Sequence, residues 1–351
     1  MPNENRELAT IQEIKKIEPI ENADALEKAT VLGWDVVVRK GEFKEGQKVV
    51  YFEIDSFLPI EDRFEFLRNS SYKRNELVGE GFRIKTIKLR GQVSQGLILP
   101  VEQFPELGSV EVGNNVTGKL NVKLFQVPEK VQGEHIVINN FHEKISKTDE
   151  IRVQSQPERL EILQGQSYYI TEKIDGMSTT ISYEKDRGVR IFTRNIEIKD
   201  DPKDSLWKFF RDIGLVEALE KTNEDIYFQG ELFGPGIQKN VLKQKQINWK
   251  WFNIGYIEDF GTRRIPKNEW KEFFDNHKDL EKFRNEHVKI LEEGNAFSYS
   301  YEDLQEISKG NYDGAGQREG IVIRPKEDLM YKNEPLSMKV INNKYLLKHD
   351  E

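Results

Sequence analysis

A lysine followed by a glycine-containing turn is the first feature of this sequence that could do chemistry. Lys173 opens the stretch KIDG, which lies between two runs rich in β-branched and aromatic residues. A neutral lysine amine is a nucleophile, and glycine allows the backbone to approach a phosphate closely. Asp175 lies on the same side of an extended chain, where its carboxylate could hold water on a metal ion. The motif is short, so by itself a solvated β-turn is the simpler interpretation.

Four further charged residues favour a functional site over a simple turn. They are Arg194 in FTRN, Glu231 in QGELFGPG, Glu319 in REGIVIRP and Lys339 in SMKVINNK. Each could be an ordinary surface charge, but each lies in or beside a strand-like apolar run with glycine or aromatic neighbours. Phe252, in WKWFNIGYI, is on general grounds more typical of a core residue than of a base-stacking platform.

A second stretch has the outline of a phosphate-binding loop but lacks its essential parts. Residues 113–119 read GNNVTGK, and Leu120 follows where a serine or threonine is needed to hold magnesium. The next residues, NVKLF, are typical of a strand rather than of a helix whose N-terminus would bind phosphate. This stretch is therefore predicted to be a turn.

Composition narrows the class of protein. The length of 351 residues is typical of two domains, and 11% aromatic residues spread along the chain indicate a folded protein. Cysteine is absent, which excludes disulfide scaffolds, zinc ribbons and thiol nucleophiles. The five histidines form no HExxH pair, which argues against a histidine-rich metal site. Because the net charge is −8, nucleic acid could bind only through a local basic surface.

Signals for membrane insertion or secretion are not found in the sequence. No uninterrupted run of about 18 apolar residues occurs, as a transmembrane helix requires. The first residues, MPNENRELATIQEIKK, contain no apolar segment of the secretory type. We therefore expect no membrane partner and an intracellular, cytoplasmic location, or a nuclear one if the source is eukaryotic.

The first half of the chain is rich in strand-like segments. Glycine-containing turns separate β-branched and aromatic runs at 34–39, 49–54, 82–90 and 96–100. Strands at such short spacing predict a small barrel or sandwich. One stretch fits a helix as well as a strand, because its isoleucines lie three residues apart, at Ile11, Ile14 and Ile17.

The second half combines strands with helices. Strand-like runs return from residue 168, the amphipathic segment 202–221 is predicted to be one helix, and 266–309 is largely helical by pattern. The last runs, GIVIRP and LSMKVINNKYLL, are predicted to be strands. Strands follow one another too closely for regular βαβ crossovers, which favours an α+β domain with antiparallel sheets.

Composition changes near residues 126–157, where QVPEK and SQPERL are typical of a connector. We place the domain boundary near Pro128. The expected organisation is an all-β domain at 1–127, followed by an α+β domain at 128–351 that includes the connector.

In their order and spacing, the charged motifs resemble those of the covalent nucleotidyltransferase superfamily, which contains ATP-dependent polynucleotide ligases and RNA capping enzymes. KIDG is similar to the nucleophile motif, ELFG to the third motif, EGIVIR to the fourth and SMKVINNK to the last. The first half resembles the OB barrel of this superfamily. Nearly the full chain resembles the two-domain RNA ligases of the Deinococcus and Naegleria type. Many relatives have a second lysine two positions into the last motif, whereas here Lys339 is followed by Ile341 and then Lys344.

The resemblance implies an RNA ligase that uses ATP with Mg²⁺ or Mn²⁺. It would join 5′-phosphate to 3′-hydroxyl ends through a lysyl-AMP on Lys173 and an adenylylated 5′ end. The implied substrate is RNA or an RNA-containing nicked duplex, with RNA on the 3′-hydroxyl side. The carboxylates of Asp175, Glu231 and Glu319 would orient metal-bound waters and a ribose hydroxyl, and Lys339 would act in catalysis beside Lys173.

The same resemblance implies the nucleotide contacts. Glu172 would read the amino edge of adenine, Phe252 would stack on the base, and Arg194 would touch the ribose or the nucleic-acid end. Arg152 would bind the triphosphate. A metal ion and the charge of Lys339 would disfavour the protonated form of the nucleophilic lysine.

A basic run in the OB-like half could hold the nucleic acid. OB surfaces bind strands with cations and aromatics, but lysines also guard solvated strand edges, and the sequence favours neither interpretation. The cations of this run are Arg83, Lys85, Lys88 and Arg90, with Lys40 and Lys44 near a turn.

Two other functions remain open. A capping-type guanylyltransferase would also use KxDG, but it would normally carry its OB domain after the catalytic domain. An inactive nucleic-acid-binding protein is the alternative from another class, and the intact lysine, aspartate and glutamates argue against it.

Overall fold

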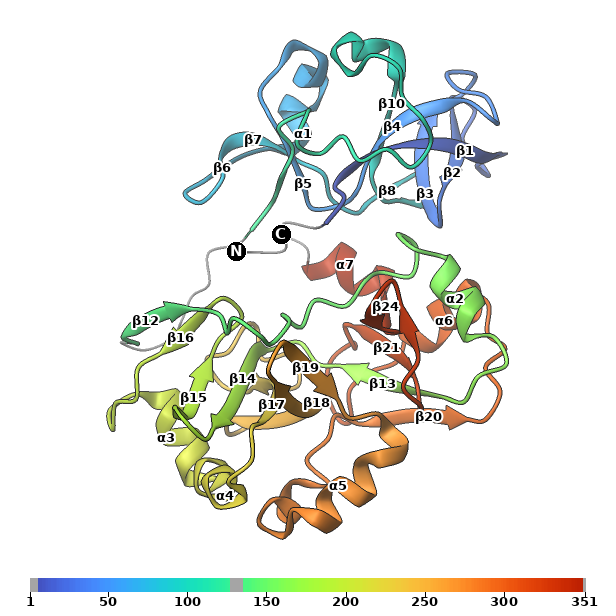
Figure 1. Ribbon diagram of the computed structural model, residues 1–351. Helices are drawn as coiled ribbons and strands as arrows, with labels where there is room; N and C mark the ends of the chain where they lie inside the picture. The colour runs from blue at the N-terminus through green and yellow to red at the C-terminus, as the bar shows by residue number, and fades with distance from the viewer. Residues whose placement is uncertain (1–5, 127–134, 350–351) are drawn as a thin grey trace. The chain divides into compact units, whose positions relative to one another are not determined.

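Residues 6–126 and 135–349 are described by the computed structural model (Figure 1), and they divide into two units. The first unit contains residues 6–126, 153–157 and 343–349, and the second contains 135–152 and 158–342. Two short segments that follow the predicted boundary at Pro128 thus belong to the first unit. The predicted boundary at Pro128 lies outside the described residues.

The first unit is built on a five-stranded antiparallel sheet with the order β10-β4-β1-β2-β3. Its strands are β1 (Ala9–Pro19), β2 (Leu26–Val31), β3 (Trp34–Arg39), β4 (Lys48–Phe52) and β10 (Leu97–Pro100). A second sheet has the order β11-β5-β7-β6, and one hairpin stands apart. These strands are β5 (Ser56–Leu58), β6 (Tyr72–Asn75), β7 (Gly79–Arg83) and β11 (Lys123–Leu124), with the hairpin of β8 (Ile87–Leu89) and β9 (Gln92–Ser94). The predicted all-β N-terminal domain is confirmed.

Strand β4 explains why this unit has two apolar clusters. Successive side chains of a strand point to opposite faces of the sheet. Accordingly, Val50 and Phe52 are buried in one cluster, and Val49 and Tyr51 are buried in the other. The uninterrupted apolar run in this strand therefore reflects burial on both faces.

A β-bulge resolves the ambiguous isoleucine spacing near the N-terminus. The segment is strand β1, and its pairing with β2 shifts register between Ile14 and Lys16. A bulge inserts one extra residue into a strand, so it interrupts the alternation of side chains. As a result, Ile14 and Ile17 contact the same apolar cluster although three positions separate them.

The second unit contains two antiparallel sheets. The larger has the order β12-β16-β15-β14-β17-β18-β19, and the smaller has the order β20-β13-β21-β24. The strands of the larger sheet are β12 (Val137–Asn140), β14 (Met177–Glu184), β15 (Gly188–Phe192), β16 (Ile196–Ile198), β17 (Ile226–Phe233), β18 (Asn248–Glu258) and β19 (Gly261–Arg264). Those of the smaller sheet are β13 (Tyr168–Lys173), β20 (Ile290–Gly294), β21 (Gly320–Pro325) and β24 (Met338–Ile341), and β22 (Met330–Tyr331) pairs with β23 (Glu334–Pro335). The predicted α+β domain with antiparallel sheets is confirmed.

The helices differ from the sequence prediction in three places. The segment 202–221 forms two helices, because Gly214 interrupts it with a φ of 74°. The segment 266–309 contains strand β20 between its helices, and the C-terminal run ends in a helix rather than a strand. The α-helices are α1 (Arg68–Ser71), α2 (Glu158–Leu163), α3 (Ser205–Asp212), α4 (Leu215–Thr222), α5 (Trp270–Asn276), α6 (Tyr301–Ser308) and α7 (Asn343–His349). Among the described residues, no helix has the length and apolar character needed to cross a membrane.

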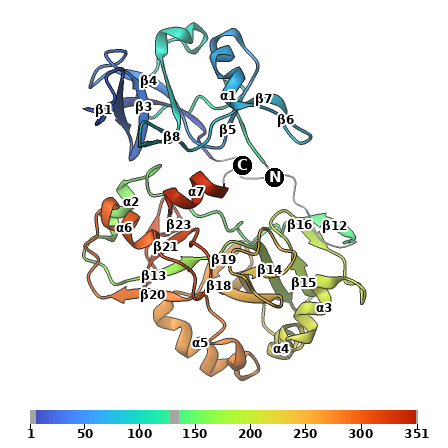
Figure 2. The ribbon, with the colours of Figure 1, turned by 180° about the vertical axis from the view of Figure 1, so that it is seen from behind.

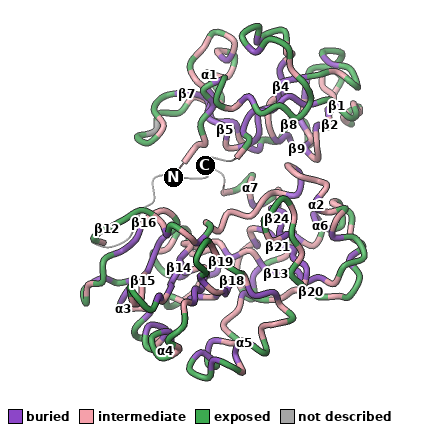
Figure 3. The backbone as a smooth tube through the Cα atoms, in the orientation of Figure 1, coloured by how far each residue is buried: buried purple, intermediate pink, exposed green. Residues whose placement is uncertain are grey.

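The largest apolar cluster holds one face of the seven-stranded sheet against α3, α4 and α5 (Figure 1, Figure 2). Trp251 of β18 is fully buried there, and its indole N–H donates to the Phe283 carbonyl at 2.7 Å. Figure 3 shows the same pattern, with buried residues concentrated along the central strands. This packing makes the sheet a rigid support for residues on its other face.

We predict that Trp251→Ala lowers the free energy of unfolding by about 3–5 kcal/mol, because it removes a large buried side chain and leaves a cavity. Phe260→Ala is the matched control, since Phe260 lies fully exposed in the turn between β18 and β19. It should change stability by less than about 0.5 kcal/mol. Urea unfolding followed by far-ultraviolet circular dichroism measures both. Equal effects of the two substitutions would contradict the assigned core.

Candidate active site

The predicted nucleophile lies at the end of strand β13, beside the glutamate of the fourth motif. In the pairing of β13 with β21, Lys173 is opposite Gly320. The Nζ of Lys173 donates to Oε2 of Glu319 at 2.7 Å. A Cβ at Gly320 would come within 2.3 Å of the Val340 carbonyl oxygen, so only glycine allows β21 to lie this close to β24.

The turn after Lys173 connects the small sheet to the large one. Strand β14 begins at Met177 and pairs with β17, with Ser178 opposite Glu231. A Cβ at Gly176 would lie 2.4 Å from the Leu232 carbonyl oxygen. The glycine of KIDG is therefore required by the close approach of this turn to β17, which carries the glutamate of the third motif.

The charges of these residues interact strongly. Burial alone would lower the pKa of Lys173, but the carboxylates of Glu319, Glu231 and Asp175 raise it above its usual value. Burial raises the pKa of Glu231 to about 8, against the opposing charge of Lys173. The lysine is thus an ammonium at neutral pH, and Glu231 retains a proton there.

A connecting segment, residues 146–152, passes from the large sheet to the small one beside these residues. On the large sheet, Gln229 of β17 donates to the Ser146 carbonyl at 2.8 Å, and Thr148 bonds Ser178 of β14 at 2.8 Å. On the small sheet, Lys339 of β24 donates its backbone N–H to the Ile151 carbonyl at 2.8 Å. The segment therefore fixes the two sheets relative to each other.

Two predicted phosphate-binding cations, Arg194 and Lys339, interact with Asp149 of this segment. Nη2 of Arg194 lies 2.7 and 2.8 Å from the two oxygens of Asp149. Burial alone would raise the pKa of Asp149, but the charges of Arg194, Lys339 and Lys173 lower it. Arg152 forms a parallel β-bridge with Lys339. The sequence predicted the four cations but gave no signal for Asp149, which lies outside the motifs.

A β-bulge sets the position of Phe252. Where β17 pairs with β18, Gln229 is opposite Asn253 and Gly230 is opposite Trp251, so Phe252 is the extra residue. Its side chain is half-buried and packs against a small apolar cluster with Ile174, next to the nucleophile. The bulge thus turns Phe252 away from the main core and toward the site, as its predicted stacking role requires.

Glu172 faces away from Lys173, as alternation along β13 dictates. It is buried, and Nη1 of Arg318 donates to its Oε1 at 3.3 Å. Burial raises the pKa of Glu172 against the charge of Arg318. Sequence reasoning identified Glu172 but missed Arg318, which immediately precedes the fourth motif.

Two further buried side chains hold the site together, and neither was predicted. The hydroxyl of Tyr312 contacts the backbone of Lys173, Asp175 and Glu319. Arg324 donates to the Phe252 carbonyl at 2.7 Å and to Ser337 Oγ at 3.0 Å, and it also pairs with Glu150.

The last motif carries its lysine on β24, at the half-buried Lys339. The side chain of Ile341 is buried at the end of the same strand. Lys344 is exposed on α7, which belongs to the first unit. Within the described part of the last motif, Lys339 is therefore the cation that this strand contributes to the site.

The carboxylates beside Lys173 have the chemistry of a divalent-cation site. Asp175, Glu231 and Glu319 supply hard oxygen atoms, which Mg²⁺ and Mn²⁺ prefer. The proton held by Glu231 marks an excess of buried negative charge that a metal ion would relieve. These three residues therefore fit a metal ion with most of its waters retained.

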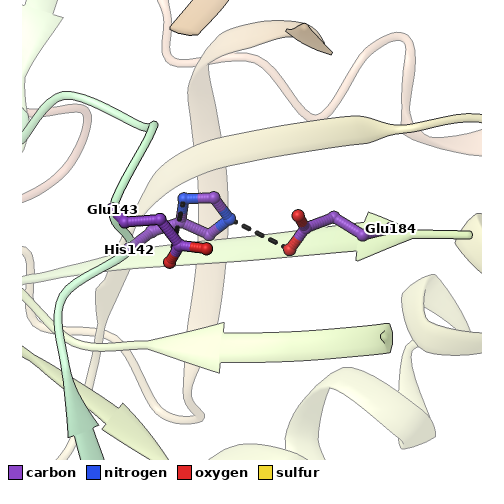
Figure 4. Close-up of side chains that lie close together, drawn as sticks. All are labelled: His142, Glu143 and Glu184. Atoms are coloured by element: carbon purple, nitrogen blue, oxygen red, sulfur yellow. Dashed lines mark hydrogen bonds and ion pairs between the residues drawn. The ribbon is translucent and has the colours of Figure 1, made fainter. Parts of the chain in front are cut away.

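A second group of possible ligands does not fit a metal (Figure 4). His142 Nδ1 accepts the backbone N–H groups of Lys144 and Ile145, so its Nε2–H donates to Glu184 at 3.1 Å. Arg190 already lies 3.0 Å from Glu184 and 3.6 Å from Glu143. The Nδ1 lone pair of His142 is already used by backbone N–H groups, and both carboxylates are paired with Arg190. This cluster is therefore structural.

The basic run of the first unit is only partly available to a ligand. Arg83 is buried, with its guanidinium 4.5 Å from the ring centroid of Phe125 and 3.4 Å from Asp55. Its predicted surface role is not supported by this position. Lys88 and Arg90 are exposed on and beside the β8–β9 hairpin.

Comparisons with known proteins agree with this geometry. The family model for RNA ligase matches residues 166–341, which is half of the chain. The chain belongs to the RNA ligase family. An OB-fold domain model matches residues 8–101, which confirms the predicted OB-like domain. A search of curated protein sequences found no match.

Solved structures of Naegleria gruberi RNA ligase are similar to this ligase over nearly its whole length. A mutant with AMP and Mn has a TM-score of 0.88, a mutant with ATP and Mn has 0.87, and the enzyme with PPi has 0.87. Each is 34% identical and covers 98% of this chain and 99% of its own. The predicted enzyme class is confirmed.

We predict that Glu231→Gln changes how stability depends on pH. In the unfolded chain Glu231 ionises near pH 4.3, and in the folded protein near pH 8. The folded state binds the extra proton between these values, so wild-type stability falls as pH rises through this window, by up to about 1.4 kcal/mol per pH unit. The glutamine variant lacks this decline.

Urea unfolding from pH 5 to 8, followed by tryptophan fluorescence, measures the effect, because four of the five tryptophans lie in the second unit. Glu220→Gln, at an exposed position of α4, is the control and should keep the wild-type slope. A glutamine variant with the wild-type slope would contradict the raised pKa.

Proposed function

We propose that this RNA ligase is ATP-dependent and joins 5′-phosphate to 3′-hydroxyl ends through a lysyl-AMP and an adenylylated 5′ end. The observation that carries the proposal is the charge around Lys173, which interacts with the carboxylates of Glu319, Glu231 and Asp175 and with Asp149, the partner of Arg194 and Lys339. The complexes of the Naegleria enzyme with ATP, AMP, PPi and Mn support the same chemistry.

In the first step, the neutral amine of Lys173 attacks the α-phosphorus of ATP. The Nζ–P bond forms, the bond from the α-phosphorus to the bridging oxygen breaks, and pyrophosphate leaves. The lysine proton must leave first, because the surrounding carboxylates favour the ammonium. A divalent cation at Asp175, Glu231 and Glu319 would neutralise these carboxylates and the charge that develops on the phosphate.

The later steps are also displacements at phosphorus. An oxygen of the RNA 5′-phosphate attacks the lysyl-AMP, the N–P bond breaks, and Lys173 is released. The 3′-hydroxyl then attacks the activated 5′-phosphorus and AMP leaves. Such reactions depend on positioning and charge neutralisation, and we assign the neutralisation of phosphates to Arg194, Lys339 and Arg152. The support is that Arg194 and Lys339 both interact with Asp149, and that Arg152 is bridged to Lys339 through the backbone.

We assign recognition of the adenine base to Phe252 and Glu172. Phe252 stacks on the adenine from its bulged position, and Glu172 accepts the amino group of the base. Arg318 holds the carboxylate of Glu172 for this contact. Asp149 pairs with Arg194, so a phosphate that binds Arg194 must compete with this carboxylate.

The proposed substrate is a nicked duplex with RNA on the 3′-hydroxyl side. The OB-fold domain would hold the nucleic acid with Lys85, Lys88 and Arg90, together with Lys40 and Lys44. We propose that nucleic-acid binding belongs to residues 1–127 and that nucleotidyl transfer belongs to residues 128–351.

A capping-type guanylyltransferase is the second candidate, because it would use the same lysine. The OB-fold domain at residues 8–101 precedes the ligase match at 166–341, the reverse of the usual capping order. Incubation with labelled ATP or GTP separates the candidates. A covalent adduct formed from ATP would support the ligase, and one formed from GTP would support the capping enzyme. If neither nucleotide gives an adduct, the result would support an inactive binding protein.

We predict that Lys173→Ala abolishes the covalent adduct with labelled ATP and the sealing of a 5′-phosphorylated nick, since no amine remains to attack phosphorus. Lys271→Ala is the matched control, because Lys271 is an exposed lysine of α5. It should form adduct at the wild-type rate. Adduct on the Lys173→Ala protein would refute the assigned nucleophile.

We also predict that the double substitution Lys88→Ala and Arg90→Ala weakens RNA binding and leaves adduct formation unchanged. The slope of log affinity against log salt should shrink by about 1 for each lost phosphate contact. Lys119→Ala, at an exposed turn of the same unit, is the control. Salt-dependent RNA titrations measure the slopes, and wild-type binding by the double variant would exclude this hairpin from the RNA surface.

A further inference from the structure

Tyr312 lies in the loop between α6 and β21, seven residues before Glu319. The loop has a defined shape, because Asn311 and Gln317 form an antiparallel bridge and the Tyr312 N–H donates to the Gly316 carbonyl at 3.0 Å. The Gly316 N–H in turn donates to the Val241 carbonyl at 3.2 Å. The backbone of Tyr312 is thus held independently of the residues that its side chain contacts.

The hydroxyl of Tyr312 uses its full hydrogen-bonding capacity on the backbone of three site residues. It donates to the Lys173 carbonyl at 2.6 Å and accepts the N–H of Asp175 at 3.1 Å and of Glu319 at 3.2 Å. A phenol has one donor and two acceptor positions, so all three are occupied. Burial and the charge of Glu319 raise the pKa of Tyr312, which keeps the donated proton on the phenol.

The ring of Tyr312 is equally constrained. It is 3% exposed and lies in the apolar cluster with Ile174 and Phe233, against which Phe252 packs. Lys173 ends β13 and Glu319 immediately precedes β21, while Asp175 lies in the turn beyond the ladder. At these positions regular strand pairing ends, so a shared hydroxyl is well placed to set their relative geometry.

We propose that Tyr312 is a positioning residue for the attack of Lys173: its hydroxyl holds the backbone of Lys173, Asp175 and Glu319 in the arrangement that lysine adenylylation requires. The inference rests on the proposed function. It assigns a role to a residue whose hydroxyl is occupied by the backbone of these three residues, so Tyr312 acts through them.

The test is Tyr312→Phe, which removes the hydroxyl and keeps the ring. The single-turnover rate of adduct formation from ATP should fall by about 10- to 100-fold, the range that small displacements of reacting groups produce. The ATP concentration at half-saturation should change by less than about threefold, because the variant keeps every nucleotide contact.

A second readout separates positioning from general damage. Sealing of an RNA that already carries a 5′-adenylyl group does not use Lys173 as nucleophile, so the Phe variant should lose much less rate there than in adduct formation. Tyr51→Phe is the matched control, since it removes another buried hydroxyl, which donates to the Gln95 carbonyl at 3.2 Å in the first unit. It should lower the Tm without changing either rate.

A Tyr312→Phe protein with the wild-type adenylylation rate would overturn the inference. Equal losses in both steps, or failure of the variant to fold, would make the role structural and would also overturn it. A wild-type chain that forms no adduct would instead overturn the proposed function.

Discussion

The three carboxylates around Lys173 are the electrostatic constraint on which the catalytic unit depends. Three negative charges and one ammonium in a partly buried site leave an excess that water cannot fully solvate. The chain relieves this excess by keeping a proton on Glu231, whose pKa is about 8. A divalent cation can replace that proton and weaken the hold of the carboxylates on the Lys173 proton. Under the proposed function, metal binding would therefore also favour the neutral, nucleophilic form of Lys173.

At the connecting segment the cations outnumber the carboxylates, because Asp149 interacts with Arg194, Lys339 and Lys173. Asp149 pairs with Arg194, and the charges of Arg194, Lys339 and Lys173 lower the pKa of Asp149. Because a phosphate is also an anion, it could take the place of the Asp149 carboxylate as the partner of Arg194. Lys173 thus interacts with both groups, the carboxylates of Glu319, Glu231 and Asp175 and the carboxylate–cation group around Asp149, and under the proposed function this mixed charge would serve attack on a metal-bound triphosphate.

The sequence predicted those parts of the fold and site that depend on residues close together in the chain. The glycines of KIDG and EGIVIR are fixed by close backbone approach, so their motifs can be recognised from short stretches. Tyr312 could not be found this way, because it bonds Lys173 from 139 positions away and belongs to no motif. Arg83 was assigned to the surface for the same reason: its partners, Asp55 and Phe125, are remote in sequence. The bulge in β1 also shows how one extra residue makes a strand resemble a helix.

Arg324 links three segments of the site through hydrogen bonds. Its buried guanidinium donates to the carbonyl of the bulged Phe252, to Ser337 beside β24 and to Glu150 of the connecting segment. A planar guanidinium holds three partners in fixed directions, as an ammonium cannot. The bulge at Phe252, the strand of Lys339 and the segment that carries Asp149 and Arg152 thus share one anchor. Moving any one of these three segments would therefore break a buried hydrogen bond of Arg324, so this single side chain keeps the β18 bulge, β24 and the connecting segment in one relative arrangement.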